Sequence, residues 1–276
     1  MSDFLSDNDF DGFRQYIYSE SGIHFSKTNR SILESRLKER LRNNDSQTPG
    51  DYLNLLKSNK EETRLFLDAI TTNLTRFFRN QAHYDTLIQH VIPQLIKYKT
   101  AKGDKRIRSW NAGCSSGEEP YTNAMVFKEH LPPGWEIEIT ASDLSLKSLM
   151  TAKEGVYPET RMSSVPEFYQ KKYFEPVEQG FKVKDSLKEL ITFDYHNLKF
   201  ETGLKDLDIV FCRNVLIYFD EAAQKNVIDH FWKAMSGYAY LFIGHSESLF
   251  GMETDFQFVK TDWACIYGKS TGDAAL

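Results

Sequence analysis

The sequence of 276 residues is long enough for a large domain and a smaller one, each with its own hydrophobic core. Its 41% hydrophobic and 26% charged residues are typical of a globular protein, and a net charge of −5 argues against general binding to nucleic acid. Three cysteines without CxxC spacing favour neither a disulfide framework nor a zinc site, so we expect no metal and a cytoplasmic location. The N-terminus lacks the pattern of a signal peptide and no apolar stretch approaches the length of a membrane span, so we expect no membrane insertion.

Residues 1–80 are predicted to form a small helical domain. Apolar residues recur at helical spacing in four stretches between residues 9 and 70, and no strand pattern or repeat interrupts them. The second stretch, residues 30–42, carries five cations against Glu34 and Glu39, although the chain as a whole is acidic. Such a charge run is either a docking surface for an acidic partner or an ordinary solvated helix face.

Residues 71–80 are unusual for a connector, because polar side chains with hydrogen-bonding groups are mixed with Leu74, Phe77 and Phe78. A helix end capped by threonine and asparagine, with the aromatic rings in the core, explains the same pattern. Residues 83–98 again show the apolar periodicity of a helix and lead through a basic loop to the first strand.

Residues 106–127 are predicted to form a strand, a turn with small residues and a helix. The turn has the spacing Gly113-x-x-x-Gly117, and Glu118 and Glu119 follow at once. Two acids at a helix start disfavour a bound phosphate, so a ligand with positive centres and no phosphate, such as S-adenosylmethionine (SAM), fits better. The alternative is a structural turn with a solvated acidic helix start.

From residue 137 onwards strands and helices alternate, which predicts a mainly parallel sheet. Asp143 ends the second strand, where an acid binds the two ribose hydroxyls in nucleotide-binding folds, although it could instead cap the following helix. Short arms of period two at residues 173–184 predict a hairpin inside a small antiparallel insertion at about 156–190. A buried strand at 207–212 ends at Arg213, on the sheet edge that Asp143 shares, and residues 256–267 are predicted to close the sheet with an antiparallel pair.

Five of these stretches together resemble the chemotaxis receptor methyltransferases of the CheR type, which are SAM-dependent protein-glutamate O-methyltransferases. In family order they are Asn73–Arg79, Gly117–Tyr121, Ala141–Asp143, Phe211–Phe219 and Gly244–Glu247. The resemblance implies an α/β fold with a Rossmann-like methyltransferase sheet, in which residues 81–276 form the SAM-binding domain and residues 1–80 the helical domain. Asn111 departs from the acid that many methyltransferases carry there. The hairpin is short, so whether it binds a receptor tail peptide stays open.

The resemblance also implies the reaction and its site. Methyl groups would pass from SAM to glutamates in the cytoplasmic domain of transmembrane chemoreceptors during sensory adaptation, leaving S-adenosylhomocysteine, and we expect the enzyme to be a monomer. Tyr218 and Arg79 are the implied catalytic residues. The residues implied to bind the cofactor are Asn73, Thr75, Arg79, Gly113, Glu118, Asp143, Asn197, Leu198, Arg213 and Asn214. Because receptor methylation regions are helices rich in glutamate, we expect them to dock on the basic helix through Arg36, Lys38, Arg40 and Arg42.

The chemistry of a glutamate acceptor agrees with the lack of an obvious base among these residues. A glutamate with a reference pKa of about 4.3 is ionised at neutral pH, so its oxygen can accept a methyl group without proton removal. We therefore expect His196 and His245 not to act as bases, and His245 to be structural. The alternatives are a methyltransferase for another protein, a nucleic acid or a small molecule, and a SAM-binding sensor without catalytic activity.

Overall fold

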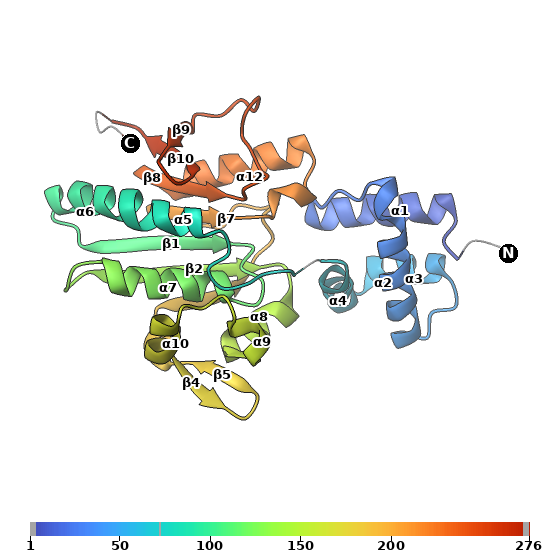
Figure 1. Cartoon of the computed structure of the whole chain (residues 1–276). Coiled ribbons are helices and arrows are strands. Elements are labelled where there is room, and N and C mark those ends of the chain that lie inside the picture. The colour runs from blue at the N-terminus through green and yellow to red at the C-terminus, as the bar shows by residue number, and fades with distance from the viewer. Residues whose placement is uncertain (1–3, 72, 273–275) are drawn as a thin grey trace.

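The computed structural model describes residues 4–71, 73–272 and 276. A helical unit, residues 4–71, lies at one end of the molecule, and an α/β unit, residues 73–272, lies at the other (Figure 1). The elements of the helical unit are α1 (Asp7–Ser21), the 3₁₀ turn η1 (Lys27–Asn29), α2 (Arg30–Asn43), α3 (Pro49–Ser58) and α4 (Lys60–Ile70).

Local signals in the sequence define the ends of these helices. Ser6 caps α1, since its side chain accepts a hydrogen bond from the amide of Asp9 at 3.1 Å, and Gly22 ends the helix in the left-handed conformation. Along α2 the buried residues are Leu33, Leu37 and Leu41, spaced four apart, and they join aromatic and aliphatic residues of the other helices in one core. The predicted all-helical N-terminal fold is confirmed.

The main sheet of the α/β unit has seven strands in the order β6-β2-β1-β7-β8-β10-β9. These strands are β1 (Arg106–Ala112), β2 (Glu136–Asp143), β6 (Ile191–Tyr195), β7 (Leu207–Cys212), β8 (Met235–Ile243), β9 (Gln257–Lys260) and β10 (Cys265–Ser270). The first five strands in this spatial order pair in parallel, and β10 runs antiparallel to both of its neighbours. From β1 the chain builds outwards to β2 and β6 and then returns to β7, so the strand order reverses between β1 and β7. Ligands of open α/β sheets bind at the carboxyl ends of the strands beside such a reversal.

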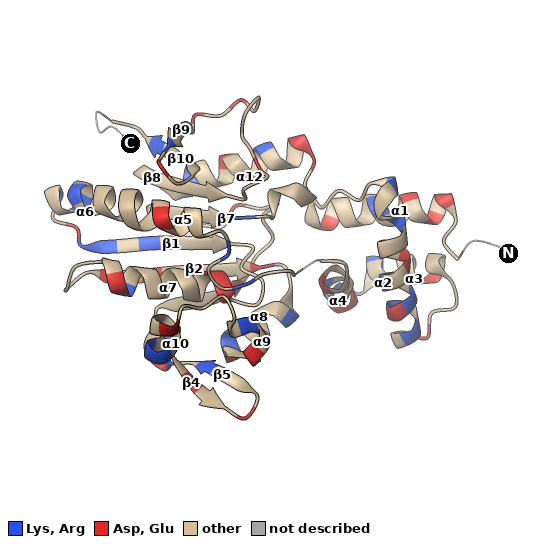
Figure 2. Cartoon of the chain, in the orientation of Figure 1, with Lys and Arg blue, Asp and Glu red and all other residues tan. Residues whose placement is uncertain are grey.

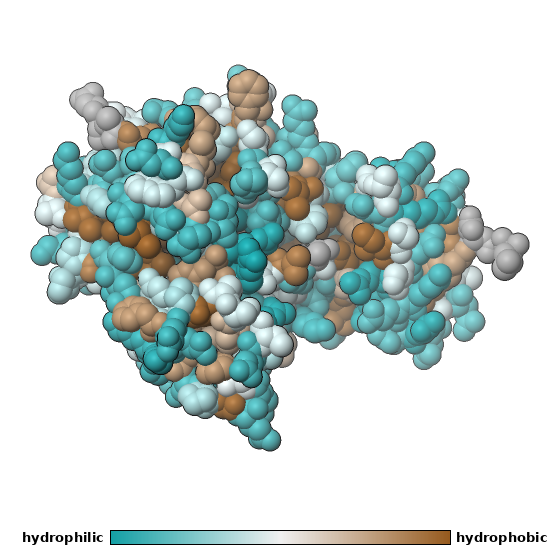
Figure 3. Space-filling view, viewed as in Figure 1, coloured by the Kyte–Doolittle hydropathy of each residue, from teal (hydrophilic) through white to brown (hydrophobic). Residues whose placement is uncertain are grey.

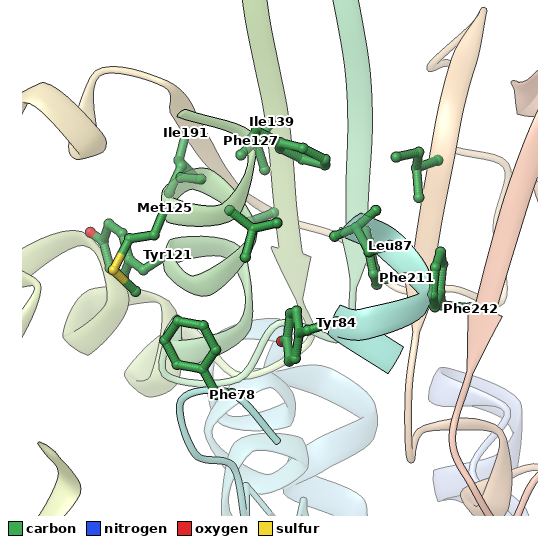
Figure 4. Packing of buried hydrophobic residues seen from close by; sticks show 14 of the residues in the cluster. Phe78, Tyr84, Leu87, Tyr121, Met125, Phe127, Ile139, Ile191, Phe211 and Phe242 are labelled. Carbon is green, nitrogen blue, oxygen red and sulfur yellow. The ribbon is translucent and has the colours of Figure 1, made fainter. Parts of the chain in front are cut away.

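Helices cover both faces of this sheet, because β7 buries apolar side chains on both faces. Ile209 and Phe211 belong to the core on one face, whereas Val210 and Cys212 belong to the core on the other. Figure 4 shows part of the first core, where side chains from α7 and the α5 region meet those of the strands. The covering elements are α5 (Gln81–Thr86), the π turn η2 (Leu87–Val91), α6 (Ile92–Ala101), α7 (Glu118–His130), α8 (Leu146–Glu154) and, on the second face, α12 (Glu221–Ala234).

The predicted insertion is a three-stranded antiparallel sheet with the order β3-β5-β4, which projects from the α/β unit (Figure 1). Its elements are β3 (Val156–Tyr157), α9 (Glu159–Met162), α10 (Glu167–Tyr173), β4 (Phe174–Val177), β5 (Gly180–Val183) and α11 (Asp185–Lys188). The hairpin of β4 and β5 is confirmed, whereas two-residue β3 was not predicted because it is too short to show a period. Tyr157 of β3 packs edge-on against Phe77, with ring centroids 4.9 Å apart, and so attaches the insertion to the main core.

Candidate active site

A cavity of about 450 Å³ opens at the carboxyl ends of β1, β2 and β7, and residues of the helical unit complete its wall. Its volume lies within the range of roughly 300–1,000 Å³ that is usual for small-molecule sites. Apolar side chains gather where the two units meet, amid a mainly hydrophilic surface (Figure 3). The lining comes from the α1–α2 connection and α2, from Ile70, Thr71, residues 73–76 and Arg79, from the turn after β1, and from the segments that follow β2, β6 and β7.

The two glycines of the turn after β1 make room for protein atoms of this same chain. Gly113 has a φ of 82°, and a Cβ atom there would lie 2.5 Å from a methyl group of Val215. Gly117 has a φ of 94°, and its Cβ would lie 2.8 Å from the Cβ of Ala152. The glycine spacing therefore lets the turn pack closely against α8 and the segment after β7, and Gly113 still lines the cavity.

Asp143, at the end of β2, lies in the cavity wall with 9% of its surface exposed. One carboxylate oxygen accepts a hydrogen bond from the amide of Ser115 at 2.7 Å, and the other accepts one from the amide of Ser145 at 2.8 Å. Burial raises the pKa of Asp143, and the amides that it accepts from partly oppose this effect. The alternative of a helix cap is wrong, because Ser145 caps α8 through its bond from the amide of Ser148. Each carboxylate oxygen retains a lone pair for a hydroxyl.

The two acids at the start of α7 have different positions, and one expectation is corrected. Glu118 is fully buried away from the cavity, where it accepts hydrogen bonds from Ser116 at 2.8 Å and from the guanidinium of Arg161. Glu119 lines the cavity instead, and its carboxylate accepts bonds from Asn111 at 2.9 Å and from Arg213 at 3.0 Å. Many methyltransferases carry an acid at the position of Asn111. In this chain the side-chain amide of Asn111 instead holds the carboxylate of Glu119 in the cavity wall.

Arg213 joins the segment after β7 to the other walls of the site. It is 7% exposed, and besides Glu119 its guanidinium donates to the backbone carbonyl of Arg79 and to the hydroxyl of Tyr84 at 3.5 Å. The guanidinium therefore fixes the end of the 71–80 connector against the reversal point of the sheet.

The motif Gly244–Glu247 braces this same segment. The carboxylate of Glu247 accepts hydrogen bonds from the amides of Asn214 at 2.9 Å, Ile217 at 3.2 Å and Gly244. Asn214 has a left-handed φ of 60°, and a Cβ on Gly244 would lie 2.7 Å from its amide nitrogen. The sequence offered only the resemblance for this motif, and the structure gives its physical role. His245 of the motif is exposed and does not line the cavity.

The connector 73–79 runs along the cavity without helix or strand structure and turns at Phe77 and Phe78. The hydroxyl of Thr71, the cap of the preceding helix, donates to the carbonyl of Asp68 at 2.9 Å, so the interpretation as a helix end holds at Thr71 but does not extend to residues 73–79. The last helix of the helical unit ends at Ile70. Asn73, Thr75 and Arg79 line the cavity, and Arg79 donates to the carbonyl of Leu74 at 2.9 Å. The rings of Phe77 and Phe78 are buried in the core, as that interpretation required.

The helical unit forms a wall that the sequence did not predict, because its pattern indicated only helices and gave no sign of a contact between residues 20–24 and the α/β unit. The amide of His24 donates to the carbonyl of Tyr218 at 2.8 Å, and Ile23 forms an isolated antiparallel bridge with Phe219. Asn197 donates from its side-chain amide to the carbonyl of Glu20 at 2.7 Å. Tyr218, in the 3₁₀ turn η3 (Leu216–Tyr218), therefore lies between the two units.

Most of the predicted site residues lie around this one cavity. Among the expected catalytic and cofactor-binding residues, those that line it are Asn73, Thr75, Arg79, Gly113, Asp143, Asn197, Leu198, Arg213, Asn214 and Tyr218. Glu118 is the exception. Glu119 and the residues of the helical unit were not predicted, since neighbouring acids at a helix start give no periodic signal of which one faces a ligand.

The four cations of α2 that we expected to dock the receptor divide into two groups. Arg40 donates to the carboxylate of Glu62 at 2.6 and 2.9 Å, and Tyr52 donates to the same carboxylate at 2.5 Å. Arg40 is therefore held inside the helical unit, and its assignment to docking is wrong. Arg36, Lys38 and Arg42 are exposed on a surface where cations and acids are mixed (Figure 2).

The cavity has groups that suit SAM. His196 Nε2 and Arg213 Nε belong to lining residues and are buried without a hydrogen-bond partner among the described residues. Burial lowers the pKa of His196, which keeps its ring neutral near pH 7. Asp143 offers free acceptor capacity to a diol, and Glu119 adds negative charge that suits a sulfonium and an ammonium. These groups fit the ligand that the sequence favoured over a phosphate compound.

The sheet order, the antiparallel β10 and this set of groups define a Rossmann-like, SAM-dependent methyltransferase. Residues 73–265 match the SAM-binding domain of the CheR methyltransferases, and residues 8–71 match the all-alpha domain of the same family. The chain therefore belongs to the CheR methyltransferase family. Among the described residues, no helix is long and apolar enough to cross a membrane.

Three relatives illustrate the extent of the similarity. The chemotaxis protein methyltransferase of Borreliella burgdorferi is 37% identical over 244 residues, which cover 85% of this chain and 86% of the relative. Chemotaxis protein methyltransferase 2 of Vibrio cholerae is 31% identical over 276 residues, with coverage of 97% and 93%. The chemotaxis protein methyltransferase of Escherichia coli is 34% identical over 263 residues, with coverage of 91% and 88%.

Proposed function

We propose that this chain transfers methyl groups from SAM to glutamate side chains in the cytoplasmic part of chemoreceptors and so forms glutamate methyl esters in sensory adaptation. The observation that carries the proposal is a cavity that joins both family domains and gathers motif residues from the connector 73–79 and from the carboxyl ends of β1, β2 and β7. Relatives named as chemotaxis protein methyltransferases match nearly the whole chain, which supports the same reaction here.

The inner wall of the cavity would hold the cofactor. In this proposal Asp143 accepts hydrogen bonds from the ribose hydroxyls, and the carboxylate of Glu119 offsets the positive charge of the ligand. When bound, SAM supplies a methyl group on a sulfonium, which passes to an acceptor oxygen and leaves S-adenosylhomocysteine. The guanidinium of Arg213, with its unused Nε–H, and the side chain of Asn214 would complete the contacts.

Arg79 and Tyr218 would act on the acceptor side of the reaction. The acceptor carboxylate is already ionised at neutral pH, so no residue needs to remove a proton. The contribution of the protein is to hold the carboxylate in line with the methyl group and to keep water away from it. Tyr218 suits this task because its backbone is held by His24 of the helical unit, and Arg79 because its side chain is anchored on the carbonyl of Leu74.

Helix α2 would guide the receptor to the cavity. Ile32 lines the cavity, and Arg36 follows it by four residues, one turn further along the same face of the helix. Lys38 lies on the other side of α2, because two residues turn a helix by about 200°. We propose that Arg36 makes the main contact with an acidic receptor helix, with Lys38 and Arg42 adding to the positive electrostatic field. We also propose that the chain acts as a monomer.

The test is a methylation assay with radiolabelled SAM and four acceptors. These are a chemoreceptor cytoplasmic fragment from the same genome, the same fragment with its methylatable glutamates replaced by glutamine, tRNA, and buffer alone. We expect base-labile label on the glutamate fragment and on no other sample. Label on tRNA would indicate a different substrate class, and tight SAM binding without any label transfer would indicate a sensor.

A further inference from the structure

The segment 73–76 has no helix or strand structure, and the exposure of its side chains alternates from one residue to the next. Asn73 and Thr75 are half-buried, whereas Leu74 and Arg76 are exposed, Leu74 to 79% of its surface. All four residues line the cavity. The half-buried side faces the wall proposed to hold the cofactor, which leaves Leu74 and Arg76 on the side from which an acceptor would arrive.

Three arginines line the cavity, and two of them are already bound within the protein. Arg213 forms its ion pair with Glu119 at 3.0 Å and is buried, and Arg79 donates to the carbonyl of Leu74 at 2.9 Å. Arg76 has no hydrogen-bond or ion-pair partner among the residues that the structure describes, although it lines the same cavity. All five of its N–H donors are therefore available to a group from outside, whereas Arg213 and Arg79 already use some of theirs within the protein.

An incoming carboxylate needs such a cation. The cavity wall already contains the carboxylates of Asp143 and Glu119, and a third carboxylate would lose water as it enters. Glu119 forms an ion pair with Arg213, whereas Asp143 accepts hydrogen bonds from the neutral backbone amides of Ser115 and Ser145. A guanidinium binds a carboxylate through two parallel N–H groups, which both compensates its charge and fixes its plane.

We propose that Arg76 binds the carboxylate of the acceptor glutamate at the mouth of the cavity, an inference that rests on the proposed function. Leu74 and Ile217, which is 53% exposed, also line the cavity and provide an apolar support for the helix that carries the acceptor. A methyl ester or a glutamine has no negative charge, so it binds Arg76 more weakly than the ionised glutamate does. Arg76 therefore selects the unmodified acceptor and favours release of the methylated one.

The experiment compares Arg76→Gln, Arg76→Lys and the control Lys97→Gln, which removes an exposed cation from α6 away from the cavity. Loss of the charge-assisted pair is expected to raise the KM for the receptor fragment about tenfold in Arg76→Gln, with kcat and SAM affinity nearly unchanged. Arg76→Lys should recover part of this loss, and Lys97→Gln should match the wild type.

A second measurement separates acceptor binding from general steering by charge. Affinities are measured in the presence of S-adenosylhomocysteine for the receptor fragment with glutamate and with glutamine at the methylated positions. The wild type should prefer the glutamate fragment, and Arg76→Gln should lose most of this preference. An unchanged KM with an unchanged preference, or a SAM affinity that falls in step with the KM, would overturn the role of Arg76. A wild type that does not methylate the glutamate fragment would instead overturn the proposed function.

Discussion

The inner wall and the outer rim of the cavity are built in different ways. The inner wall is fixed by hydrogen bonds that backbone amides donate to two carboxylates. Asp143 accepts buried bonds from the turn after β1 and from the start of α8, and Glu247 accepts bonds from the segment after β7. The rim, which we define as Ile32, Leu74, Arg76 and Ile217, is exposed.

The difference matches the two ligands of the proposed reaction. A small cofactor gains affinity from groups that are held in place before it binds, because little conformational entropy of the protein is then lost on binding. A receptor helix presents several different glutamates in turn, and an exposed rim with few internal bonds can adjust to each of them. Changes to the inner wall should therefore alter cofactor binding and stability strongly, whereas changes to the rim or α2 should alter only the receptor KM.

The largest effect is expected for Glu247→Ala, which removes the brace of the inner wall. It leaves the amides of Asn214, Ile217 and Gly244 without their acceptor, and the loss should lower the free energy of unfolding by about 3 kcal/mol and nearly abolish methyl transfer. Chemical denaturation and single-turnover kinetics measure the two effects. The matched control is Glu253→Ala, an exposed acid in the same loop region. Normal turnover in folded Glu247→Ala would show that the segment after β7 needs no brace.

Asp143→Ala should weaken both SAM and S-adenosylhomocysteine by about 1.5–3 kcal/mol, because a charge-assisted pair of hydrogen bonds to the ribose is lost. It should also lower stability, since the amides of Ser115 and Ser145 lose their acceptors. Asp143→Asn keeps one acceptor oxygen and should be intermediate in both respects. Calorimetry gives the affinities, and an unchanged affinity in a folded Asp143→Ala protein would rule out the ribose contact.

Tyr218→Phe tests the boundary between the inner wall and the helical unit, because it removes one hydroxyl where they meet. Methyl transfer in a single turnover should slow by about tenfold, the effect of one hydrogen bond to the acceptor, with cofactor affinity unchanged. The residue lines the cavity beside the helical unit, so the fold should tolerate the change. If the rate equals that of the wild type, Tyr218 only packs between the units.

Part of the inner wall could be predicted from the sequence, but only where a local pattern of residues indicates the structure. The run Leu207–Cys212 is apolar except for Asp208 and lies in the middle of the sheet, buried at every position. Because parallel strands end at one edge, Asp143 and Arg213 could be placed together from the order of strands and helices alone.

The failures share a cause, which is that the deciding partner lies far away in the sequence. Arg40 reads as a surface cation until Glu62, on another helix, is brought beside it. Glu118 and Glu119 are equivalent in sequence, and they differ only because Arg161 of the insertion pairs with the first and Arg213 with the second. No periodic pattern contains such tertiary information.

The pH dependence offers a graded test of the inner wall. Burial raises the pKa of Asp143 above its ordinary value of 3.8, so the native protein holds this proton at a higher pH than the unfolded chain. Between these two pKa values the contribution of Asp143 to stability falls as the pH rises. Cofactor affinity should change in the opposite direction, since the protonated acid is a poorer acceptor, and it should weaken as the pH is lowered through the native pKa. Calorimetry across this range should show the decline in the wild type, whereas Asp143→Asn should lack this component.

The smallest effect is expected on α2, where the comparison of Arg36→Ala with Lys38→Ala tests whether the receptor follows one face of the helix. Arg36 is 48% exposed with Glu39 4.0 Å away, and single exposed ion pairs contribute only about 0.2–1 kcal/mol. The receptor KM should therefore rise by about two- to fivefold in Arg36→Ala at low salt, and less at high salt, where the charges are screened. Lys38→Ala, on the other side of the helix, should change the KM less, and SAM affinity should be unaffected in both. Equal changes in the two variants would mean that α2 acts through its total charge, and no change in either would place receptor docking on the rim alone.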